Sequence, residues 1–521
     1  MAKKKQQMHA KSVFSLLFGK LSIVILLMLV QLAILLVAII LLGDHFVAVY
    51  GFLTALSVTI AVWLVSKDEN PAYKLAWIIP ILIFPIFGGL FYLMFGNKSM
   101  PKKLARRITL AEKSAPRVLA QDASCVEELR EADPGMATLS DYILRTTGSP
   151  LWKNTQSEYL PIGETMWARM LEELPKAKRF IFMEYFILEE GVMWEPIFQI
   201  LREKAAEGVD VRFMYDDLGS IMTLPANYAA KLRKAGIKCA LFNPFQPHLN
   251  SMMNYRDHRK ITVIDGDVGF CGGINIADEY INDYEKHGHW KDAAVMLRGD
   301  AVWSLATMFL TMWDSISDEE LSDPERYRPL PEELPGSFSG IVQPYADSPL
   351  DRDLVGEMVY LNIINRAQRY LYICTPYLIV DNETLTALLL AAKSGVDVRI
   401  ITPHIGDKWY VHLLTRACYP QLVRGGVKIY EYTPGFIHSK TFVSDDEVAT
   451  VGTINLDYRS LYLHFECGLW MAHSSCISAV RDDFLETLRV CEQVTLDSPF
   501  LKLNGFERLL RAVLRIFAPL M

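Results

Sequence analysis

The chain has 521 residues, a formal net charge of −7 and a hydrophobic fraction of 51%, with a positive mean hydropathy of +0.16. This length is enough for two domain-sized lobes and additional elements. The acidic balance excludes the chain-wide basic charge that nucleic-acid binding needs, although a local basic surface is still compatible with it. The hydrophobic fraction is high for a soluble enzyme, and its excess lies near the N-terminus.

Three apolar runs without a charged residue follow one another at residues 21–43, 46–66 and 75–96. Each run is long enough to cross the hydrocarbon core of a bilayer as a helix. A cleaved signal peptide is the competing interpretation of the first run. It is disfavoured because no small-residue cleavage site follows and a second apolar run begins at once. The sequence therefore predicts a membrane region over residues 1–100 and a multi-pass membrane protein.

Basic residues flank the membrane region on both sides, which predicts that both flanks lie in the cytoplasm. Three complete crossings cannot place both flanks on one side of the membrane. The third run is interrupted by Pro80, Pro85 and two glycines, so it is the candidate for a re-entrant segment. The alternative, in which all three runs cross and the catalytic part faces outward, stays open.

The remaining sequence divides into two lobes. Residues 101–140 are charged and of mixed composition, and we predict a linker of one or two helices there. The first lobe is expected at residues 141–325 and the second at 346–521. Acidic, proline-rich sequence between them predicts an inter-lobe linker at residues 326–345.

The two lobes resemble each other along their length. The run Arg179-Phe-Ile-Phe-Met-Glu-Tyr-Phe is similar to Arg369-Tyr-Leu-Tyr-Ile, and Gly208-Val-Asp-Val-Arg has its counterpart in Gly395-Val-Asp-Val-Arg. Each repeat alternates strand-like and helix-like segments, which predicts an α/β fold with βαβ units around a mostly parallel sheet. The period is too long for a solenoid, so we expect an internal pseudo-two-fold duplication.

The pattern His-x-Lys-x4-Asp occurs once in each repeat, as His258-Arg-Lys-Ile-Thr-Val-Ile-Asp265 and as His438-Ser-Lys-Thr-Phe-Val-Ser-Asp445. A glycine and an asparagine follow each copy at matching offsets. A single copy would be a weak signal, but two copies with these additions are hard to obtain by chance. Because alternate residues of a strand share a face, each histidine is expected beside its lysine. Neither lobe holds both histidines, so the site should lie between the lobes.

Two imidazoles and two ammonium groups suit the cleavage of a phosphodiester through a covalent phosphohistidine, with neither metal nor cofactor required. The aspartates lie beyond the strand ends and are expected to brace the site. The predicted catalytic residues are His258, Lys260, Asp265, His438, Lys440 and Asp445. The predicted phosphate-binding residues are Gly272, Asn275, Gly452 and Asn455.

Two further features complete the chain. Eight cysteines occur without a Cys-x-x-Cys pair, which favours buried free thiols over metal ligands and weakly favours a reducing compartment.

The C-terminal residues 505–517 predict a basic amphipathic helix, with Arg508, Arg511 and Arg515 on one side. Such a helix lies either on an anionic membrane surface or on the body of the enzyme, and the sequence favours neither.

The paired motifs resemble the phospholipase D superfamily. The narrower resemblance is to bacterial cardiolipin synthases, and it is carried by Gly272-Gly-Ile-Asn-Ile-Ala-Asp, Trp290-Lys-Asp292, Val451-Gly-Thr-Ile-Asn-Leu-Asp and His464-Phe-Glu466. It implies two phospholipase D-like αβα lobes behind N-terminal transmembrane helices. It also adds Thr453 to the phosphate-binding set, where the first half has Gly273. Glu466 and Asp292 become supporting residues that hydrogen-bond the motif histidines.

The implied reaction is phosphatidyl transfer between two phosphatidylglycerol molecules, which gives cardiolipin and glycerol. The resemblance assigns His258 as nucleophile and His438 as general acid and base, with the reverse assignment open. The partners are phosphatidylglycerol and membrane lipid, and no nucleic acid. A membrane phospholipase D that uses water and a phosphatidyltransferase with another acceptor alcohol share this chemistry and are the alternatives. A nuclease and an inactive scaffold fit the apolar runs and the intact motifs less well.

Overall fold

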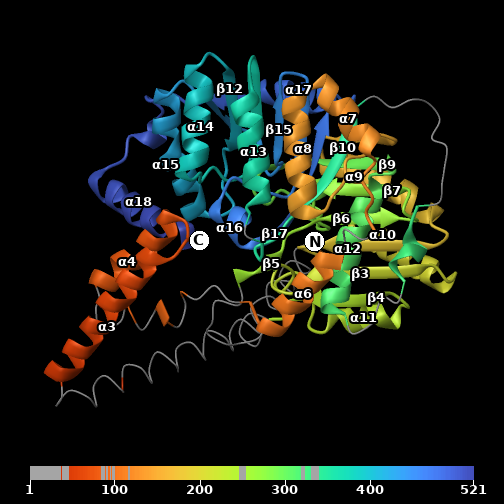
Figure 1. Cartoon of the computed structure of the whole chain (residues 1–521), viewed down its shortest axis with the longest axis horizontal. Helices are drawn as coiled ribbons and strands as arrows, with labels where there is room; N and C mark the ends of the chain where they lie inside the picture. The colour runs from red at the N-terminus through yellow and green to blue at the C-terminus, as the bar shows by residue number, and fades with distance from the viewer. Residues whose placement is uncertain are drawn as a thin grey trace, which may run out of the picture. The chain divides into compact units, whose positions relative to one another are not determined.

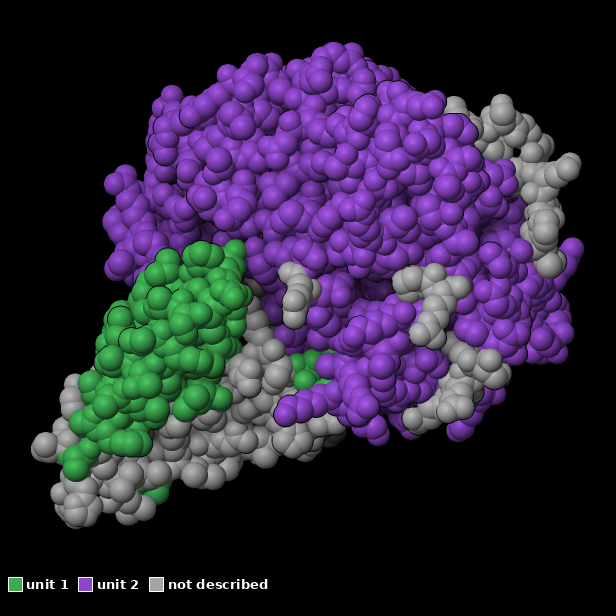
Figure 2. All heavy atoms as spheres, viewed as in Figure 1, with its two compact units in different colours: residues 1–101, 244–254 green, residues 102–243, 255–521 purple. Residues whose placement is uncertain are grey.

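The computed structural model of the chain describes residues 37, 46–83, 89, 92–93, 96, 100–114, 118–245, 254–317, 323–329, 340–351 and 353–520. Two compact units are present, residues 1–101 with 244–254 and residues 102–243 with 255–521 (Figure 2). Apart from residue 37, the first predicted apolar run at 21–43 lies outside the described residues.

In the first unit, α3 (Phe46–Ser66) coincides with the second predicted apolar run, and α4 (Pro71–Ile83) contains the start of the third. Asn70 precedes α4, and its side chain accepts a hydrogen bond from the N–H of Ala72 at 2.9 Å, which satisfies one free donor of the first turn. Among the described residues, no helix has both the length and the apolar character needed to cross a membrane. The transmembrane helices stay a prediction.

The first lobe is built on a seven-stranded sheet of order β1-β9-β7-β6-β2-β3-β4. Alternate side chains of the buried central strand pack on opposite faces. Phe182 stacks on Phe309 of α12, whereas Ile181 and Met183 belong to the core under α9 and α10. The lobe is thus a helix–sheet–helix sandwich (Figure 1). The strands are β1 (Thr155–Leu160), β2 (Phe180–Tyr185), β3 (Asp210–Asp216), β4 (Lys238–Phe242), β6 (Ile261–Ile264), β7 (Val268–Gly272) and β9 (Ala294–Gly299); the helices are α9 (Gly163–Glu173), α10 (Trp194–Ala206), α11 (Tyr228–Lys234) and α12 (Val302–Ile316).

The second lobe repeats this plan in a sheet of order β10-β17-β16-β15-β11-β12-β13-β18. Here Tyr372 stacks on Phe484 of α17, while Leu371 and Ile373 pack in the core with Val355 of α13. The strands are β10 (Ile341–Asp347), β11 (Tyr370–Cys374), β12 (Asp397–Pro403), β13 (Lys428–Tyr432), β15 (Thr441–Ser444), β16 (Val448–Gly452), β17 (His464–Ala472) and β18 (Cys491–Gln493); the helices are α13 (Val355–Arg366), α14 (Asn382–Lys393), α15 (Trp409–Arg424), α16 (Tyr458–Tyr462), α17 (Cys476–Leu488) and α18 (Gly505–Phe517).

The sheets are mixed, which corrects the expectation of a mostly parallel arrangement. In the first lobe only β2–β3 and β3–β4 are parallel pairs. The motif strand β6 instead forms a hairpin with β7. The turn between them contains Asp265 and Gly266 with φ values of +54° and +82°. Asp-Gly with two positive φ values favours a tight hairpin turn, so β6 returns directly to β7 rather than through a helix. The second motif strand, β15, returns to β16 through Asp445 and Asp446, which also have positive φ values of +58° and +63°.

The two lobes exchange short strands next to the motifs. β5 (Arg256–Asp257) of the first lobe pairs in parallel with β17 of the second. Reciprocally, β14 (Gly435–Ile437) pairs in parallel with β8 (His289–Lys291) of the first lobe. The N–H of His258 then donates to the carbonyl of Phe465 at 2.9 Å, and that of His438 to the carbonyl of Lys291 at 2.6 Å. Each motif histidine is therefore fixed by the backbone of the opposite lobe.

The helices after residue 101 differ from the linker that we predicted over 101–140. α6 (Lys102–Ser114) packs on α12 of the first lobe. α7 (Ala123–Ala132) and α8 (Pro134–Thr147) contribute to the core of the second lobe, although the first lobe follows them in sequence (Figure 1). Residues 341–345, predicted as linker, belong to β10. An amphipathic pattern predicts that a helix packs against other elements, but it does not say against which of two similar lobes. The sequence therefore could not assign these helices to a lobe.

Candidate active site

Both motif histidines line one cavity of about 840 Å³ that is bounded by both lobes of the second unit. His258 and His438 are 7% and 6% exposed, and Asn275 and Asn455 line the same space. The motif lysines Lys260 and Lys440 are buried beside it. The structure thus brings together one His, one Lys and one Asn from each half of the chain.

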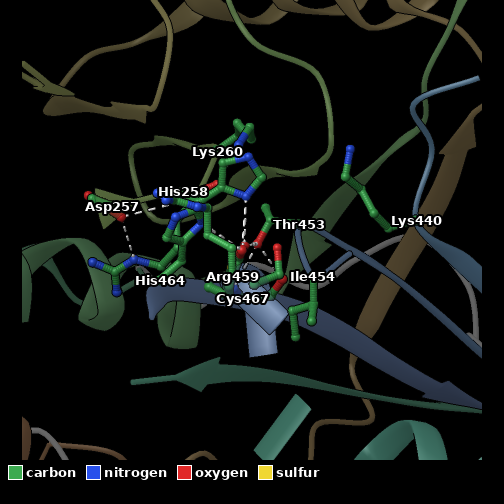
Figure 3. Close-up of polar contacts among 12 residues, drawn as sticks. Asp257, His258, Lys260, Lys440, Thr453, Ile454, Arg459, His464 and Cys467 are labelled. Carbon is green, nitrogen blue, oxygen red and sulfur yellow. Dashed lines mark hydrogen bonds and ion pairs between the residues drawn. The ribbon is translucent and has the colours of Figure 1, made fainter. Parts of the chain in front are cut away.

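A carboxylate of the second lobe holds His258. Its Nδ1 lies 3.0 Å from both Oε1 and Oε2 of Glu466, a fully buried residue on β17. The carboxylate is itself fixed because the hydroxyl of Thr453 donates to its Oε2 (Figure 3). An Nδ1–H bonded to a carboxylate sets the tautomer of the ring, so Nε2 carries the lone pair.

A carboxylate of the first lobe holds His438, whose Nδ1 also lies 2.9 Å from Nζ of Lys440. Its Nδ1 lies 2.5 Å from Oδ2 of Asp292, which directly follows β8. The other oxygen, Oδ1, accepts the N–H of Ala293 at 2.8 Å. Trp290, Tyr280 and Phe436 surround the imidazole with ring centroids 5.4–5.7 Å away. These aromatic rings pack around the imidazole and restrict its rotation.

Burial and neighbouring positive charge keep both imidazoles neutral. Burial, followed by the ammonium groups of Lys260 and Lys440, lowers the pKa of His258 well below its usual value. Burial and Lys440 likewise lower the pKa of His438 to about 4, against the opposing effect of Asp292. A bound phosphodiester carries a negative charge at this point and acts in the opposite direction, so substrate binding favours the protonated imidazole that proton donation requires.

The two lysines also respond to burial. Burial lowers the pKa of Lys260 to about 8 and that of Lys440 to about 7. Each ammonium donates to the carbonyl of the histidine two residues before it. A phosphate oxygen between them would restore full charge on both, since the anion stabilises the protonated amine. The site is therefore ready for an anion.

The motif aspartates lie at the far end of the motif strands. Asp265 accepts backbone N–H groups of Lys178, Arg179 and Phe180 at 2.7–2.9 Å. Asp445 accepts those of residues 368–370 at 2.7–2.8 Å. Four strand residues separate each aspartate from its lysine, so about 16 Å of extended chain lies between the two Cα atoms. These carboxylates anchor the starts of β2 and β11, and neither lines the cavity.

Three residues that we predicted to bind phosphate serve other contacts. Thr453 is fully buried behind Glu466 and does not line the cavity. A Cβ on Gly272 would lie 2.4 Å from the carbonyl oxygen of Ala293, and one on Gly452 would lie 2.5 Å from that of Cys467. Both glycines allow close approach of the neighbouring chain, at the start of β9 and in β17. That these three residues bind phosphate remains a prediction.

The two asparagines differ in their protein contacts. The side chain of Asn275 accepts the N–H of Ile187 at 2.9 Å and donates to the hydroxyl of Tyr280 at 2.7 Å. The side-chain oxygen of Asn455 is buried and has no hydrogen-bond partner among the described residues. Asn455 is thus the asparagine with more hydrogen-bonding capacity left for a ligand.

Sequence reasoning missed a third histidine in the cavity. His464 is 7% exposed, and its ring centroid lies 5.4 Å from that of His258. Its Nδ1 lies 3.6 Å from Oε1 of Glu466. Burial lowers its pKa to about 3. Its position two residues before Glu466 on β17 was the available signal, because alternate residues of a strand share a face.

Within the described part of the chain, two groups of side chains have the composition to hold a metal ion. Ligand atoms of His258, His464 and Glu466 lie within 4.8 Å of one another, as do those of Glu357, Asp381 and Glu383. The first group overlaps the histidine pair, so a cation there would compete with the bond between His258 and Glu466. That the reaction needs no metal remains a prediction.

The fold and the paired site define a phospholipase D-like protein with two repeated α/β domains. The family model described as cardiolipin synthase, PLD-like domain, matches residues 170–302 and 360–488. A second model, phospholipase D-nuclease N-terminal, matches residues 55–97. Both pairs of motif histidine and lysine fall within the two matched domains.

Similar proteins cover most of the chain. A cardiolipin synthase of Geobacillus thermodenitrificans is 34% identical over 92% of this chain and 95% of its own length. An uncharacterized protein of Streptococcus mutans is 44% identical over 88% of this chain and 99% of its own length. The crystal structure of a phosphatidylserine synthase of Haemophilus influenzae has the same fold, with a TM-score of 0.55 and 16% identity over 74% of this chain and 98% of that one. The chain belongs to the cardiolipin synthase family, and it is a phosphatidyltransferase.

The role of Asp265 as an anchor is testable by substitution. Asp265→Ala removes three hydrogen bonds to a charged acceptor, so we expect it to lower the free energy of unfolding by about 2–4 kcal/mol. Turnover of the folded variant should stay within roughly threefold, since the carboxylate lies outside the cavity. Thermal unfolding and phosphatidyl transfer are measured together, with Asp283→Ala at an exposed position as control. Loss of turnover without loss of stability would instead assign Asp265 to the reaction.

The neutral histidines predict a stability that depends on pH. His438 and His464 have pKa values of about 4 and 3 in the folded chain and about 6.5 when unfolded. The unfolded state therefore binds more protons below about pH 6.5, and stability falls as the pH decreases. At pH 5 each histidine should cost about 2 kcal/mol.

This pH effect is measured as the shift of the substrate-free melting temperature between pH 7 and pH 5. We expect the shift to be smaller in His464→Asn than in the wild-type chain. His473→Asn, at an exposed position, should leave it unchanged. An unchanged shift in His464→Asn would show that this imidazole already binds a proton in the folded state.

Proposed function

We propose that the protein is a cardiolipin synthase that transfers the phosphatidyl group of one phosphatidylglycerol to another through a phosphohistidine. The proposal rests on two imidazoles, one from each lobe, that line one cavity, with the ammonium groups of Lys260 and Lys440 close enough to lower the pKa of His258. Each ring keeps Nε2 for reaction because a carboxylate of the other lobe occupies Nδ1.

In the first half-reaction, Nε2 of His258 attacks the phosphorus of phosphatidylglycerol. The N–P bond forms, the P–O bond to the glycerol head group breaks, and protonated His438 gives its proton to the departing oxygen. Lys260, Lys440 and Asn455 hold the non-bridging oxygens, on which negative charge increases in the transition state. Glu466 stabilises the positive charge that forms on His258.

In the second half-reaction, neutral His438 takes the proton from a hydroxyl of a second phosphatidylglycerol. That oxygen attacks the phosphorus, the N–P bond breaks, and cardiolipin leaves with the neutral His258 restored. Asp292 stabilises the imidazolium of His438 in both steps, because Asp292 itself stays ionised. Burial alone would raise the pKa of Asp292, but Lys440 and His438 lower it below its usual value, so the group stays a carboxylate.

The acceptor separates this proposal from its alternatives. Water in the second half-reaction would make the protein a membrane phospholipase D, and another alcohol would make it a different phosphatidyltransferase. The family membership and the aromatic rings around His438 favour a lipid alcohol over bulk water. We further propose a location in the bacterial cell membrane, held by the apolar runs of residues 1–100.

The assay supplies phosphatidylglycerol labelled in its head group and in its acyl chains to purified full-length protein in detergent, with a chelator present. Labelled cardiolipin and free glycerol in equal amounts are expected. Phosphatidic acid as the main lipid product would show a hydrolase, and loss of turnover with the chelator would overturn the metal-free mechanism. His258→Ala and His438→Ala should each lose several orders of magnitude, because the pair acts as one unit.

The carboxylate that each lobe supplies to the motif histidine of the other lobe gives a second test. Glu466→Gln keeps the size of the side chain but removes the charge that stabilises imidazolium, so kcat should fall by roughly 10³-fold or more. Glu431→Gln is a matched control, because Glu431 is also buried and lies 2.9 Å from Nδ1 of His404 but outside the cavity. We expect the control to keep its kcat within a few-fold. A Glu466→Gln variant with normal kcat would remove Glu466 from the mechanism.

A further inference from the structure

The C-terminal helix α18 presents an uncovered apolar stripe. Phe506, Leu509 and Val513 are 74%, 63% and 41% exposed, and their spacing of three and four residues places them on one side of the helix. Asn504 caps the helix through a reciprocal contact with Glu507, so the stripe begins on a fixed first turn. Large exposed apolar residues in a row are unusual on a surface that meets only water.

The remaining sides of α18 show how the helix is oriented. Leu514 packs with the small cluster of Ile379, Leu414 and Ala518, which attaches the helix to α15. Arg508 and Arg515 are exposed, and a period of about 3.6 residues per turn places them on the side of α18 opposite the apolar stripe. An apolar side backed by a basic side is the arrangement of a helix that lies in the plane of an anionic membrane surface, where long arginine side chains extend to the lipid phosphates.

The same surface borders the active-site cavity. Leu514 and Ala518 line the cavity from the side of α18, and Lys408 and Trp409 line it from the start of α15. Trp409 is 66% exposed, so the cavity reaches the surface of the molecule at this border. An apolar stripe, exposed cations and the entrance to a phosphate-binding cavity therefore adjoin one another.

We propose that α18 and the first turn of α15 form an interfacial docking surface for an anionic phospholipid bilayer. The apolar stripe inserts among the acyl chains, the arginines lie at the level of the lipid phosphates, and the cavity entrance faces the bilayer. This inference rests on the proposed function in one respect. A cavity of about 840 Å³ accepts a phosphodiester and glycerol but cannot also hold the acyl chains of two diacyl lipids, which must stay in the bilayer.

The insertion of α18 is measured with a spin label in the full-length chain. Val513→Cys is labelled and reconstituted into vesicles of phosphatidylglycerol and phosphatidylcholine. The label should be more accessible to oxygen than to a water-soluble nickel complex, at a depth of about 5–10 Å below the head groups. Val192→Cys, 48% exposed in the first lobe, is the matched control and should show the opposite preference. The eight native cysteines are buried or half-buried, and labelled wild-type protein gives their background.

Two label results would overturn the inference. A label at position 513 that the nickel complex reaches freely in vesicles would show that α18 faces water. A label that neither reagent reaches, in detergent as in vesicles, would show that another segment of the chain or a second copy covers the stripe. Either result is independent of whether the protein makes cardiolipin.

The docking surface also predicts a selective loss of activity. Leu509→Gln with Val513→Gln should lower turnover of phosphatidylglycerol in vesicles by roughly tenfold or more, since two apolar side chains no longer insert. Turnover of short-chain phosphatidylglycerol, dispersed below its micelle concentration, should stay within twofold. Equal losses on both substrates would overturn the docking role. Insertion of the label without any phosphatidyl transfer would retain the surface and reject the proposed function.

Discussion

The structure depends on one reciprocal contact, in which each motif histidine is held by a carboxylate from the other half of the chain. Glu466 on β17 binds His258, and Asp292 after β8 binds His438. Two short parallel strand pairs between the lobes place these groups, because the N–H of each histidine bonds to the residue directly before the opposite carboxylate. The tautomer of each imidazole is thus a property of the whole two-lobed unit and of neither lobe alone.

Charge balance explains why such a site tolerates burial. Two lysines and two histidines meet two carboxylates, and each of these side chains is less than a tenth exposed. Without a ligand, burial lowers the pKa values of all four basic groups, and repulsion from neighbouring positive charge lowers those of His258, His438 and Lys440 further. A phosphodiester supplies the missing negative charge, so its binding completes a set of interactions that the empty site leaves unbalanced.

The sequence was sufficient for those parts of the site that depend on local spacing. The offsets from His258 to Lys260 and Asn275, repeated from His438, indicated strands, duplication and a shared site between the lobes. The contacts of Thr453 and the two glycines within the protein were not predicted, because small residues serve both phosphate binding and close packing between strands, and spacing alone does not separate the two uses. His464 was missed since its proximity to His258 arises only when β5 pairs with β17.

The same limit applies to the fold. Hydrophobic periodicity identified strands and helices within each lobe, but it did not predict which distant segments pack or pair with one another. α7 and α8 joined the second core across the whole first lobe, and the hairpins after each motif made the sheets mixed. Both outcomes depend on tertiary contacts between distant segments, which periodicity does not encode.

The exchange of carboxylates also constrains how the two halves can diverge. The first half pairs Asp292 with Gly273, where a Cβ would lie 2.2 Å from Oδ1 of that aspartate, while the second half pairs Glu466 with Thr453. A substitution near the carboxylate of one repeat therefore changes the position and the tautomer of the imidazole in the other repeat. A change at a histidine of one repeat should be compensated near the carboxylate of the other repeat. A chimaera that takes one half from a relative would combine each histidine with a carboxylate from a different parent, so both histidines at the reacting phosphorus would be affected.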